Sequence, residues 1–182
     1  MTLRRLWTIG LLSMAFGLQA TTGPLAGVLP HPGDALLTSL AQTRTTPESV
    51  AQWLKRGIAF RSDLLLFHRI DYWQSAQELL DRGAGDCEDY AILARDILRR
   101  QGRTAFLFSL YGRAGYAHTV CVFVEEGRYN IINQDRLVRS RAPTLEKLAQ
   151  TICPEWTWGA VAEREGHRGR ALRVIRNPRV PA

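Results

Sequence analysis

The feature that most limits the fold of this sequence is a change in hydrophobic period at Gly102. Before this glycine, apolar residues recur at the i, i+3, i+4, i+7 and i+8 positions of one helix face: Tyr90, Leu93, Ala94, Ile97 and Leu98. After it, residues 104–110 resemble a strand, and residues 118–135 resemble a β-hairpin with its turn at Gly127. A short helix is expected over 143–152. Helices thus precede strands, which predicts an α+β fold with helices packed on an antiparallel sheet.

Helix boundaries follow from capping signals. Thr46 is a good N-cap before a proline, and Gly57 is a good stop, so a helix is expected between them. A second helix is expected from about residue 72 to residue 82. The third begins after Asp86, and Asp89 lies three residues further on, which is the spacing of a capping box.

The chain divides into four segments by composition. Residues 1–20 contain two arginines, an apolar run from Leu6 to Leu18 and then Ala20, the pattern of a cleaved signal peptide; a retained N-terminal anchor is the alternative. Residues 21–45 are rich in Gly, Pro and Thr and are interpreted as a linker. The folded domain is expected over 46–153, followed by a basic C-terminal tail over 154–182.

The formal net charge is +7, and arginine supplies most of the positive residues. The arginines of the C-terminal segment are interpreted as a solvated tail, with an anionic surface or polysaccharide as the alternative partner. Nucleic acid is not expected as a partner because this charge is not interleaved with aromatic residues. The N-terminal segment predicts a periplasmic or secreted protein, with envelope association through either end as an open option.

Cys87 is the residue that points to chemistry. It lies at the start of the third helix, where free N–H groups and the helix dipole favour a thiolate, and the thiolate is the nucleophilic form of cysteine. Glu88 and Asp89 oppose this: a carboxylate at roughly 7 Å costs about 0.6 kcal/mol in water and about 2.4 kcal/mol at an effective dielectric of 20. A dipole contributes less than about 1 kcal/mol, so a histidine is needed to activate the thiol.

Three of the four histidines have no obvious oriented partner: His31 in the expected linker, His68, and His167 in the expected tail. His118 does have one. If residues 126–127 form a two-residue turn, paired strand positions add up to 253, and His118 faces Asp135. A glycine bulge would make this pair diagonal, and Asn133 on the same face is the second candidate to orient the ring. Cys87, His118 and Asp135 then supply nucleophile, base and orienting acid.

These residues resemble the transglutaminase-like superfamily, and most closely its bacterial cysteine proteinase branch. The resemblance rests on "DYWQSAQELL", "GDCEDYA", a histidine strand and an acidic residue on the next strand, and it spans residues 71–137. It implies a papain-like, transglutaminase-like core over 46–153, with Cys87 as nucleophile, His118 as general base and Asp135 as orienting acid. The surroundings of the histidine differ from those of many relatives, which affects the substrate rather than the triad.

The resemblance also bears on whether the acidic residues around Cys87 bind a metal ion. Some relatives in the proteinase branch bind calcium through acidic residues around the cysteine, and Asp86, Glu88 and Asp89 are the counterparts here. The same acids can serve as helix cap and dipole complement, so no metal and no cofactor are expected.

Two neighbours of the site have open roles. Trp73 is either a core residue or an aromatic wall beside the thiol, and Gln74 next to it is a candidate for the oxyanion or substrate vicinity. Cys121 differs in parity from His118 and so faces the other side of its strand. A disulfide between Cys121 and Cys153 would leave Cys87 as the free thiol.

The leading functional hypothesis is an exported thiol hydrolase that cleaves a peptide or isopeptide amide through an acyl-enzyme, with a protein or peptide as substrate. A second hypothesis is protein-glutamine acyl transfer, in which an amine replaces water and a crosslink forms. A third, from another class, is a non-catalytic binding module on the same fold.

Overall fold

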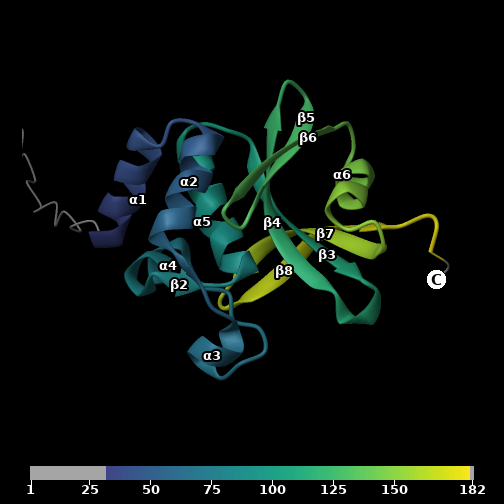
Figure 1. The fold of residues 1–182 in the computed structure, drawn as a ribbon, viewed down its shortest axis with the longest axis horizontal. Coiled ribbons are helices and arrows are strands. Elements are labelled where there is room, and N and C mark those ends of the chain that lie inside the picture. Colours follow the sequence, from purple (N-terminus) through teal and green to yellow (C-terminus); the bar gives the residue numbers. More distant parts are fainter. Residues whose placement is uncertain (1–31, 181–182) are drawn as a thin grey trace, which may run out of the picture.

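The computed structural model describes residues 32–180. Its main feature is a six-stranded antiparallel sheet in the order β6-β5-β4-β3-β7-β8 (Figure 1). The strands of this sheet are β3 (Ala105–Gly112), β4 (Ala117–Glu125), β5 (Arg128–Asn133), β6 (Arg136–Ala142), β7 (Trp156–Glu165) and β8 (Arg168–Arg176). Two short strands, β1 (Ala59–Phe60) and β2 (Ala84–Gly85), form a separate parallel pair. The helices are α1 (Pro32–Thr43), α2 (Pro47–Gly57), α3 (Asp63–Phe67), α4 (Ala76–Arg82), α5 (Cys87–Arg100) and α6 (Leu145–Ile152), with a 3-10 turn at Arg113–Gly115.

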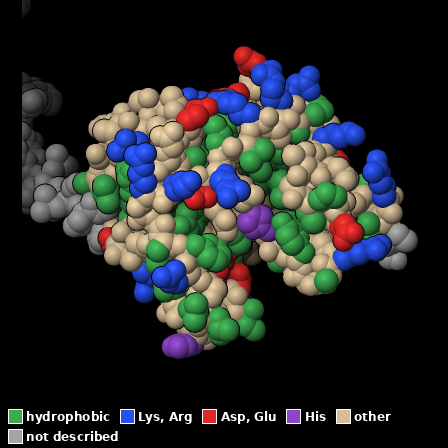
Figure 2. All heavy atoms as spheres, in the orientation of Figure 1, with side chains coloured by type: hydrophobic (Ala, Val, Ile, Leu, Met, Phe, Trp, Pro, Cys, Tyr) green, Lys and Arg blue, Asp and Glu red, His purple; other side chains and the backbone are tan. Residues whose placement is uncertain are grey.

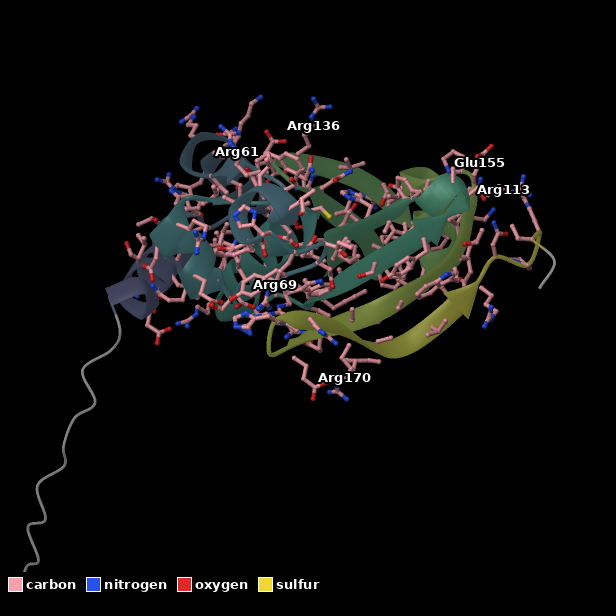
Figure 3. All side chains as sticks on the ribbon, turned by 90° about the horizontal axis from the view of Figure 1, so that it is seen from below. Arg61, Arg69, Arg113, Arg136, Glu155 and Arg170 are labelled. Carbon is pink, nitrogen blue, oxygen red and sulfur yellow. The ribbon has the colours of Figure 1, made fainter. Side chains whose placement is uncertain are left out.

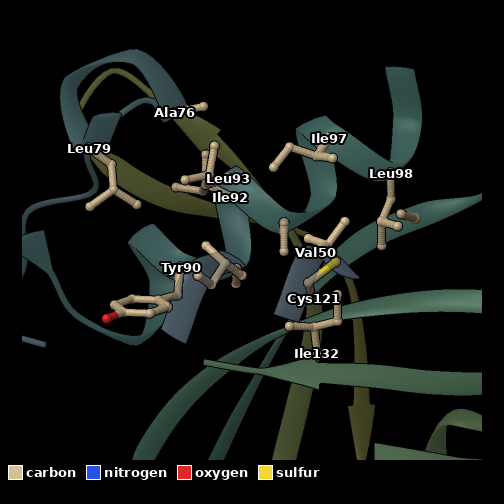
Figure 4. Packing of buried hydrophobic residues seen from close by; sticks show 14 of the residues in the cluster. Val50, Ala76, Leu79, Tyr90, Ile92, Leu93, Ile97, Leu98, Cys121 and Ile132 are labelled. Carbon is tan, nitrogen blue, oxygen red and sulfur yellow. The ribbon is translucent and has the colours of Figure 1, made fainter. Parts of the chain in front are cut away.

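The sheet separates two hydrophobic clusters. On one face, α5 lies against β3 and β4, with α1, α2 and α4 around it (Figure 1). Leu93, Ile97 and Leu98 of α5 are completely buried there (Figure 4). On the other face, α6 packs through Leu148 against β5 and β6. The expected α+β fold, with helices packed on an antiparallel sheet, is confirmed.

Two of the capping predictions hold at the atomic level. The side chain of Thr46 accepts a hydrogen bond from the N–H of Ser49 at the start of α2, and Pro47 is its first residue. At α5, the carboxylate of Asp89 accepts from the N–H of Asp86, as the capping-box spacing requires. Local hydrogen bonding therefore decides where both helices begin.

The second predicted helix begins later than residue 72. Ser75 is the N-cap of α4, and its side chain and that of Glu78 form a reciprocal capping box. Trp73 is extended instead, because its N–H donates to the carbonyl of His167 near the start of β8. The start at residue 72 was thus wrong, and the Ser-x-x-Glu signal that sets the true boundary is visible in the sequence.

The predicted linker over 21–45 was wrong in its second half. Residues 32–43 form α1, whereas 1–31, including the predicted signal peptide, lie outside the described residues. Leu37, Leu40 and Ala41 are buried in the first hydrophobic cluster and have the i, i+3, i+4 spacing of a helix face. The Gly and Pro residues that suggested a linker lie before or at the start of this helix.

The predicted basic tail over 154–182 was also wrong. Most of it forms β7 and β8, and β7 pairs with the central strand β3. Ala160 and Ala162 of β7 are buried, whereas β8 is an edge strand whose arginines are exposed, as Arg170 shows in Figure 3. The arginines are thus compatible with a strand because one side of β8 faces solvent.

The cysteines Cys121 and Cys153 do not form the disulfide that the sequence left open. Both are free thiols, and they belong to the clusters on opposite faces of the sheet. Cys121 is completely buried beside Ile132 (Figure 4). None of the helices described between residues 32 and 180 is long and apolar enough to span a membrane.

Candidate active site

The N-terminus of α5 is anchored by one carboxylate. Asp89 accepts hydrogen bonds from the Asp86 N–H and from the main-chain N–H and side-chain amide of Gln74, at 3.2, 2.8 and 2.6 Å. Gly85 precedes this turn, and a Cβ at that position would overlap the carboxylate of Asp89. Cys87, the first residue of α5, is therefore held at a defined place beside the sheet.

Gln74 has a structural role rather than the predicted role near an oxyanion. It is completely buried, and its amide nitrogen donates both to Asp89 and to the carbonyl of Ala84. Its oxygen accepts from Nε of Arg82 at 3.2 Å. Since both N–H groups are occupied, no donor remains for a substrate oxygen.

Trp73 is a core residue, which was one of the two alternatives that the sequence left open. Its side chain is only 5% exposed and belongs to the first hydrophobic cluster, yet one part of it lines a surface cavity. Its Nε1 donates to Asp71 at 2.9 Å. A Cβ on Gly169 of β8 would overlap the indole ring, so this glycine allows the close approach of the two segments.

Buried acids surround the nucleophile candidate. Sγ of Cys87 donates to Oε2 of Glu88 at 3.1 Å, and Asp63 at the start of α3 packs in the same cluster. Burial, followed by the nearby carboxyl groups, raises the pKa of Glu88 to about 9 and that of Asp63 to about 6. Burial and the charge of Glu88 raise the pKa of the Cys87 thiol far above its usual range. Burial and the surrounding acids therefore oppose formation of a thiolate at Cys87.

The acidic cluster has unused ligand atoms. Asp63 Oδ1 and Asp86 Oδ1 are buried without a hydrogen-bond partner among the described residues. Ligand atoms of Asp63 and Asp86, and of Asp86 and Glu88, lie within 4.8 Å of one another. Asp89 already accepts three hydrogen bonds, so its carboxylate is the least available to a hard cation, whereas Asp63 lies close to both Asp86 and Glu88. Sequence reasoning missed Asp63 because it lies far from the cysteine along the chain.

The predicted hairpin register is correct. Cys121 pairs with Ile132 and Glu125 with Arg128, so paired positions add up to 253. The ladder, however, ends at the Cys121–Ile132 pair, before it reaches His118. Beyond that pair, residues of β4 and β5 no longer form ladder pairs.

Asn133, not Asp135, holds the histidine. Nε2 of His118 lies 2.7 Å from Oδ1 of Asn133. Asp135 lies in the turn after β5, where Gln134 has a positive φ of 52° and Arg136 already pairs with Asn133. No ion pair joins Asp135 to His118 in the described part of the chain. The predicted His118–Asp135 contact was therefore wrong, because the chain turns one residue before Asp135.

The two halves of the site meet at Thr119. The main chain of Thr119 opposes the rise in the pKa of the Cys87 thiol and so lies near it, and Thr119 directly follows His118. Tyr116 lies on the other side of the histidine, with its ring centroid 6.2 Å from that of His118. Burial and the charges of Cys153 and Cys87 raise the pKa of Tyr116, so this residue also lies near the thiol. His118 hydrogen bonds to Asn133 and the Cys87 thiol to Glu88, and no hydrogen bond joins Cys87 to His118 among the described residues.

Side chains of both charges appear on the face of the molecule that Figure 2 shows. Figure 2 shows acidic side chains just below a histidine near the centre of the face, whereas lysines and arginines are spread around it. His68 is exposed at the end of α3, and His167 stacks on Tyr72 at 4.2 Å, so neither takes part in the Cys87 cluster.

Comparisons with known proteins found similar solved structures and one matching family model. Calcium-bound LapG of Legionella pneumophila is 19% identical over 68% of this chain and 70% of its own, with a TM-score of 0.48. A proposed cysteine protease of Cytophaga hutchinsonii is 16% identical over 78% of this chain and 49% of its own, with a TM-score of 0.45. No curated protein sequence matches significantly. A family model described as "Transglutaminase-like domain" matches residues 36–143, more than half of the chain. The protein therefore belongs to the transglutaminase-like domain family.

Proposed function

We propose that this protein is an exported thiol hydrolase that cleaves a peptide or isopeptide amide, with Cys87 as nucleophile and His118 as general base. The observation that carries the proposal is the 2.7 Å contact between His118 Nε2 and Asn133 Oδ1. An amide oxygen accepts, so Nε2 carries the proton and Nδ1 is left as the basic atom. This is the Cys-His-Asn arrangement of papain-like proteases. Asn133 thereby takes the orienting role that the sequence gave to Asp135.

In the proposed reaction, the Cys87 thiol turns from Glu88 toward His118 and gives its proton to Nδ1. The thiolate attacks the amide carbonyl, and the free N–H of Cys87 at the start of α5 stabilises the oxyanion. The His118 imidazolium then protonates the departing amine, which leaves an acyl-enzyme on Sγ. A water molecule, deprotonated by the same Nδ1, releases the acid product and restores the thiol.

A calcium ion bound by Asp63, Asp86 and Glu88 would support this reaction. When bound, it supplies positive charge that offsets the carboxylates next to the thiol. The two unpartnered buried oxygens of Asp63 and Asp86 support this role, and LapG of Legionella pneumophila is known in a calcium-bound form. The calcium ion takes no part in the proton transfers, which His118 carries out.

The proposal is tested by alkylation and turnover. Iodoacetamide should modify Cys87 faster than it modifies Cys153, which is also partly exposed, and His118→Ala should remove most of this difference. Peptide pools should then be cleaved by the wild type and not by Cys87→Ala. Cys87 alkylation no faster than that of Cys153 would contradict an activated nucleophile and favour a binding module.

The choice between hydrolysis and acyl transfer needs one further measurement. The protein is incubated with the same peptide pool and a labelled primary amine. Hydrolysis predicts new carboxyl termini with little incorporated label, because water resolves the acyl-enzyme. Incorporation that outpaces hydrolysis would overturn the hydrolase proposal in favour of a crosslinking acyltransferase.

A further inference from the structure

A cavity of 220 Å³ lies on the α5 side of the sheet, next to the acidic cluster. Its floor is made of small side chains of the three strands β3, β7 and β8, among them Ser109, Ala160 and Ala171. Larger residues at these positions would fill it. The small side chains thus leave a volume of 220 Å³ open beside the sheet.

Aromatic residues form the walls. Tyr111 and Trp158 stack face to face with ring centroids 3.7 Å apart and an interplanar angle of 9°. Trp73 lines the cavity as well, and it is fixed by its contact with Gly169. Indole and phenol faces attract cations through their quadrupole, and tryptophan does so most strongly.

Asp71 supplies a negative charge at the rim. Its Oδ1 accepts the hydrogen bond from Trp73, and within residues 32–180 no lysine or arginine forms an ion pair with it. The nearest arginine in sequence, Arg69, lies over the ring of Tyr72 instead, 5.2 Å from its centroid. The carboxylate of Asp71 is exposed and is therefore available to a ligand.

The cavity begins close to the thiol. The carboxyl oxygens of Asp71 and Glu88 lie within 4.8 Å of each other, and Glu88 contacts Sγ of Cys87 at 3.1 Å. Burial, followed by the nearby Asp71, Glu88 and Cys87, raises the pKa of Tyr111, which lines the cavity. A residue that flanks the bond attacked by Cys87 can therefore place its side chain between the aromatic walls.

We propose that this cavity binds the lysine or arginine side chain of a substrate residue next to the scissile amide. The proposal rests on the hydrolase function above and adds a substrate class to it. The aliphatic part of a lysine would lie on the small-residue floor, its ammonium group would meet the aromatic faces, and Asp71 would supply the counter-charge. A glutamate at the same position would meet the carboxylate of Asp71 and is disfavoured.

The test is a peptide pool in which each position around the cleaved bond is randomised, with norleucine as the uncharged counterpart of lysine. Cleavage products are quantified by mass spectrometry at low peptide concentration, so that the yields report kcat/KM. At one position, lysine and arginine should exceed norleucine by about 10-fold, as one cation–π contact and one ion pair allow. Asp71→Asn should reduce this ratio to about 3-fold or less, and Trp158→Leu should reduce it as well.

Asp81→Asn is the matched control, because Asp81 is an exposed carboxylate on α4 that does not line the cavity. It should keep the 10-fold ratio. A second measurement does not depend on turnover: tryptophan fluorescence of Cys87→Ala is titrated with a lysine peptide and with its norleucine counterpart. Tighter binding of the lysine peptide, lost in Cys87→Ala/Asp71→Asn, supports the cavity even if no peptide is cleaved.

The outcomes separate the two proposals. Cleavage without a preference for lysine or arginine at any position would overturn the cavity proposal and leave the hydrolase intact. Selective binding without cleavage would overturn the hydrolase and keep the cation site. Equal binding of both peptides, with no change in Asp71→Asn, would overturn the cavity proposal.

Discussion

The two halves of the candidate site are built in opposite ways. The half at the start of α5 is buried and acidic, and its thiol donates to Glu88 at 3.1 Å while burial raises the thiol pKa. The half at the start of β4 is half-buried, and it consists of one histidine held by one amide oxygen at 2.7 Å. The nucleophile is thus firmly placed among acids that disfavour its thiolate, whereas the base is oriented by one amide contact.

This difference shows that position and activation come from different parts of the chain. The helix N-terminus supplies position, through Asp89 and Gln74, but its dipole contributes less than about 1 kcal/mol against the nearby carboxylates. Activation must come from His118, or from a cation that neutralises the acids. Each of the following changes acts on one half of the site only. It therefore tests whether position and activation come from different parts of the chain.

The largest effect is expected from removal of the nucleophile or the base. Cys87→Ser should lower the rate of amide hydrolysis by at least about 10⁴-fold, because the alcohol is much harder to ionise beside Glu88. His118→Ala should lower it by about 10²- to 10⁴-fold, since general-base catalysis is lost. The rates are measured with any peptide that the wild type cleaves. Cys153→Ser is the control, and an equal loss there would mean that turnover does not depend on the thiol at α5.

The orienting residue gives the next largest effect. Asn133→Ala should lower kcat by about 10- to 100-fold with little change in KM, because the His118 ring is then free to rotate and to change tautomer. Asp135→Ala should change kcat by less than about 3-fold, since Asp135 does not contact the ring. A large loss of kcat in Asp135→Ala together with a small loss in Asn133→Ala would contradict this assignment. Asp135 would then be the orienting acid, as the sequence predicted, and the contact between His118 and Asn133 would not be the catalytic arrangement.

These two residues also show what the sequence could and could not predict. Residue spacing predicted α2, α5 and the β4–β5 register, because caps, turns and alternation are local signals. The end of the ladder at Cys121–Ile132 and the turn at Gln134 depend on where β6 pairs, which is not a local property. The correct register therefore led to the wrong orienting residue.

Composition misled the prediction at both ends of the domain. The many exposed arginines of β8 resemble a solvated tail, so the edge strand was not recognised. The prolines before α1 resemble a linker, so the apolar face of that helix was not recognised either. The acid Asp63 was missed for a similar reason, because three-dimensional folding rather than sequence distance brings it to Glu88. The fold class and the cysteine and histidine positions could be predicted, whereas the lining of the site could not.

Calcium tests the acidic half alone. At a concentration of 100 times Kd, a bound ion should stabilise the protein by about 2.7 kcal/mol, which corresponds to a rise in Tm of roughly 5–10 °C. It should also speed alkylation of Cys87, because positive charge favours the thiolate. Differential scanning fluorimetry and iodoacetamide kinetics, each with calcium or EGTA, measure the two effects. Asp63→Asn should reduce both and Asp81→Asn neither; a Tm that calcium leaves unchanged would remove the cation from the proposal.

The smallest effect tests how β8 supports the acidic half. Gly169→Ala places a methyl group against the Trp73 ring and should lower the free energy of unfolding by about 1–3 kcal/mol, measured by urea denaturation. Arg170→Ala, on the same strand but exposed, should change it by less than about 0.5 kcal/mol. Because Trp73 is hydrogen bonded to Asp71, the glycine variant should also weaken the lysine preference while Asn133 still holds His118. Equal stability of the two variants would mean that β8 can move away from Trp73, and that the C-terminal strands do not fix the wall of the cavity.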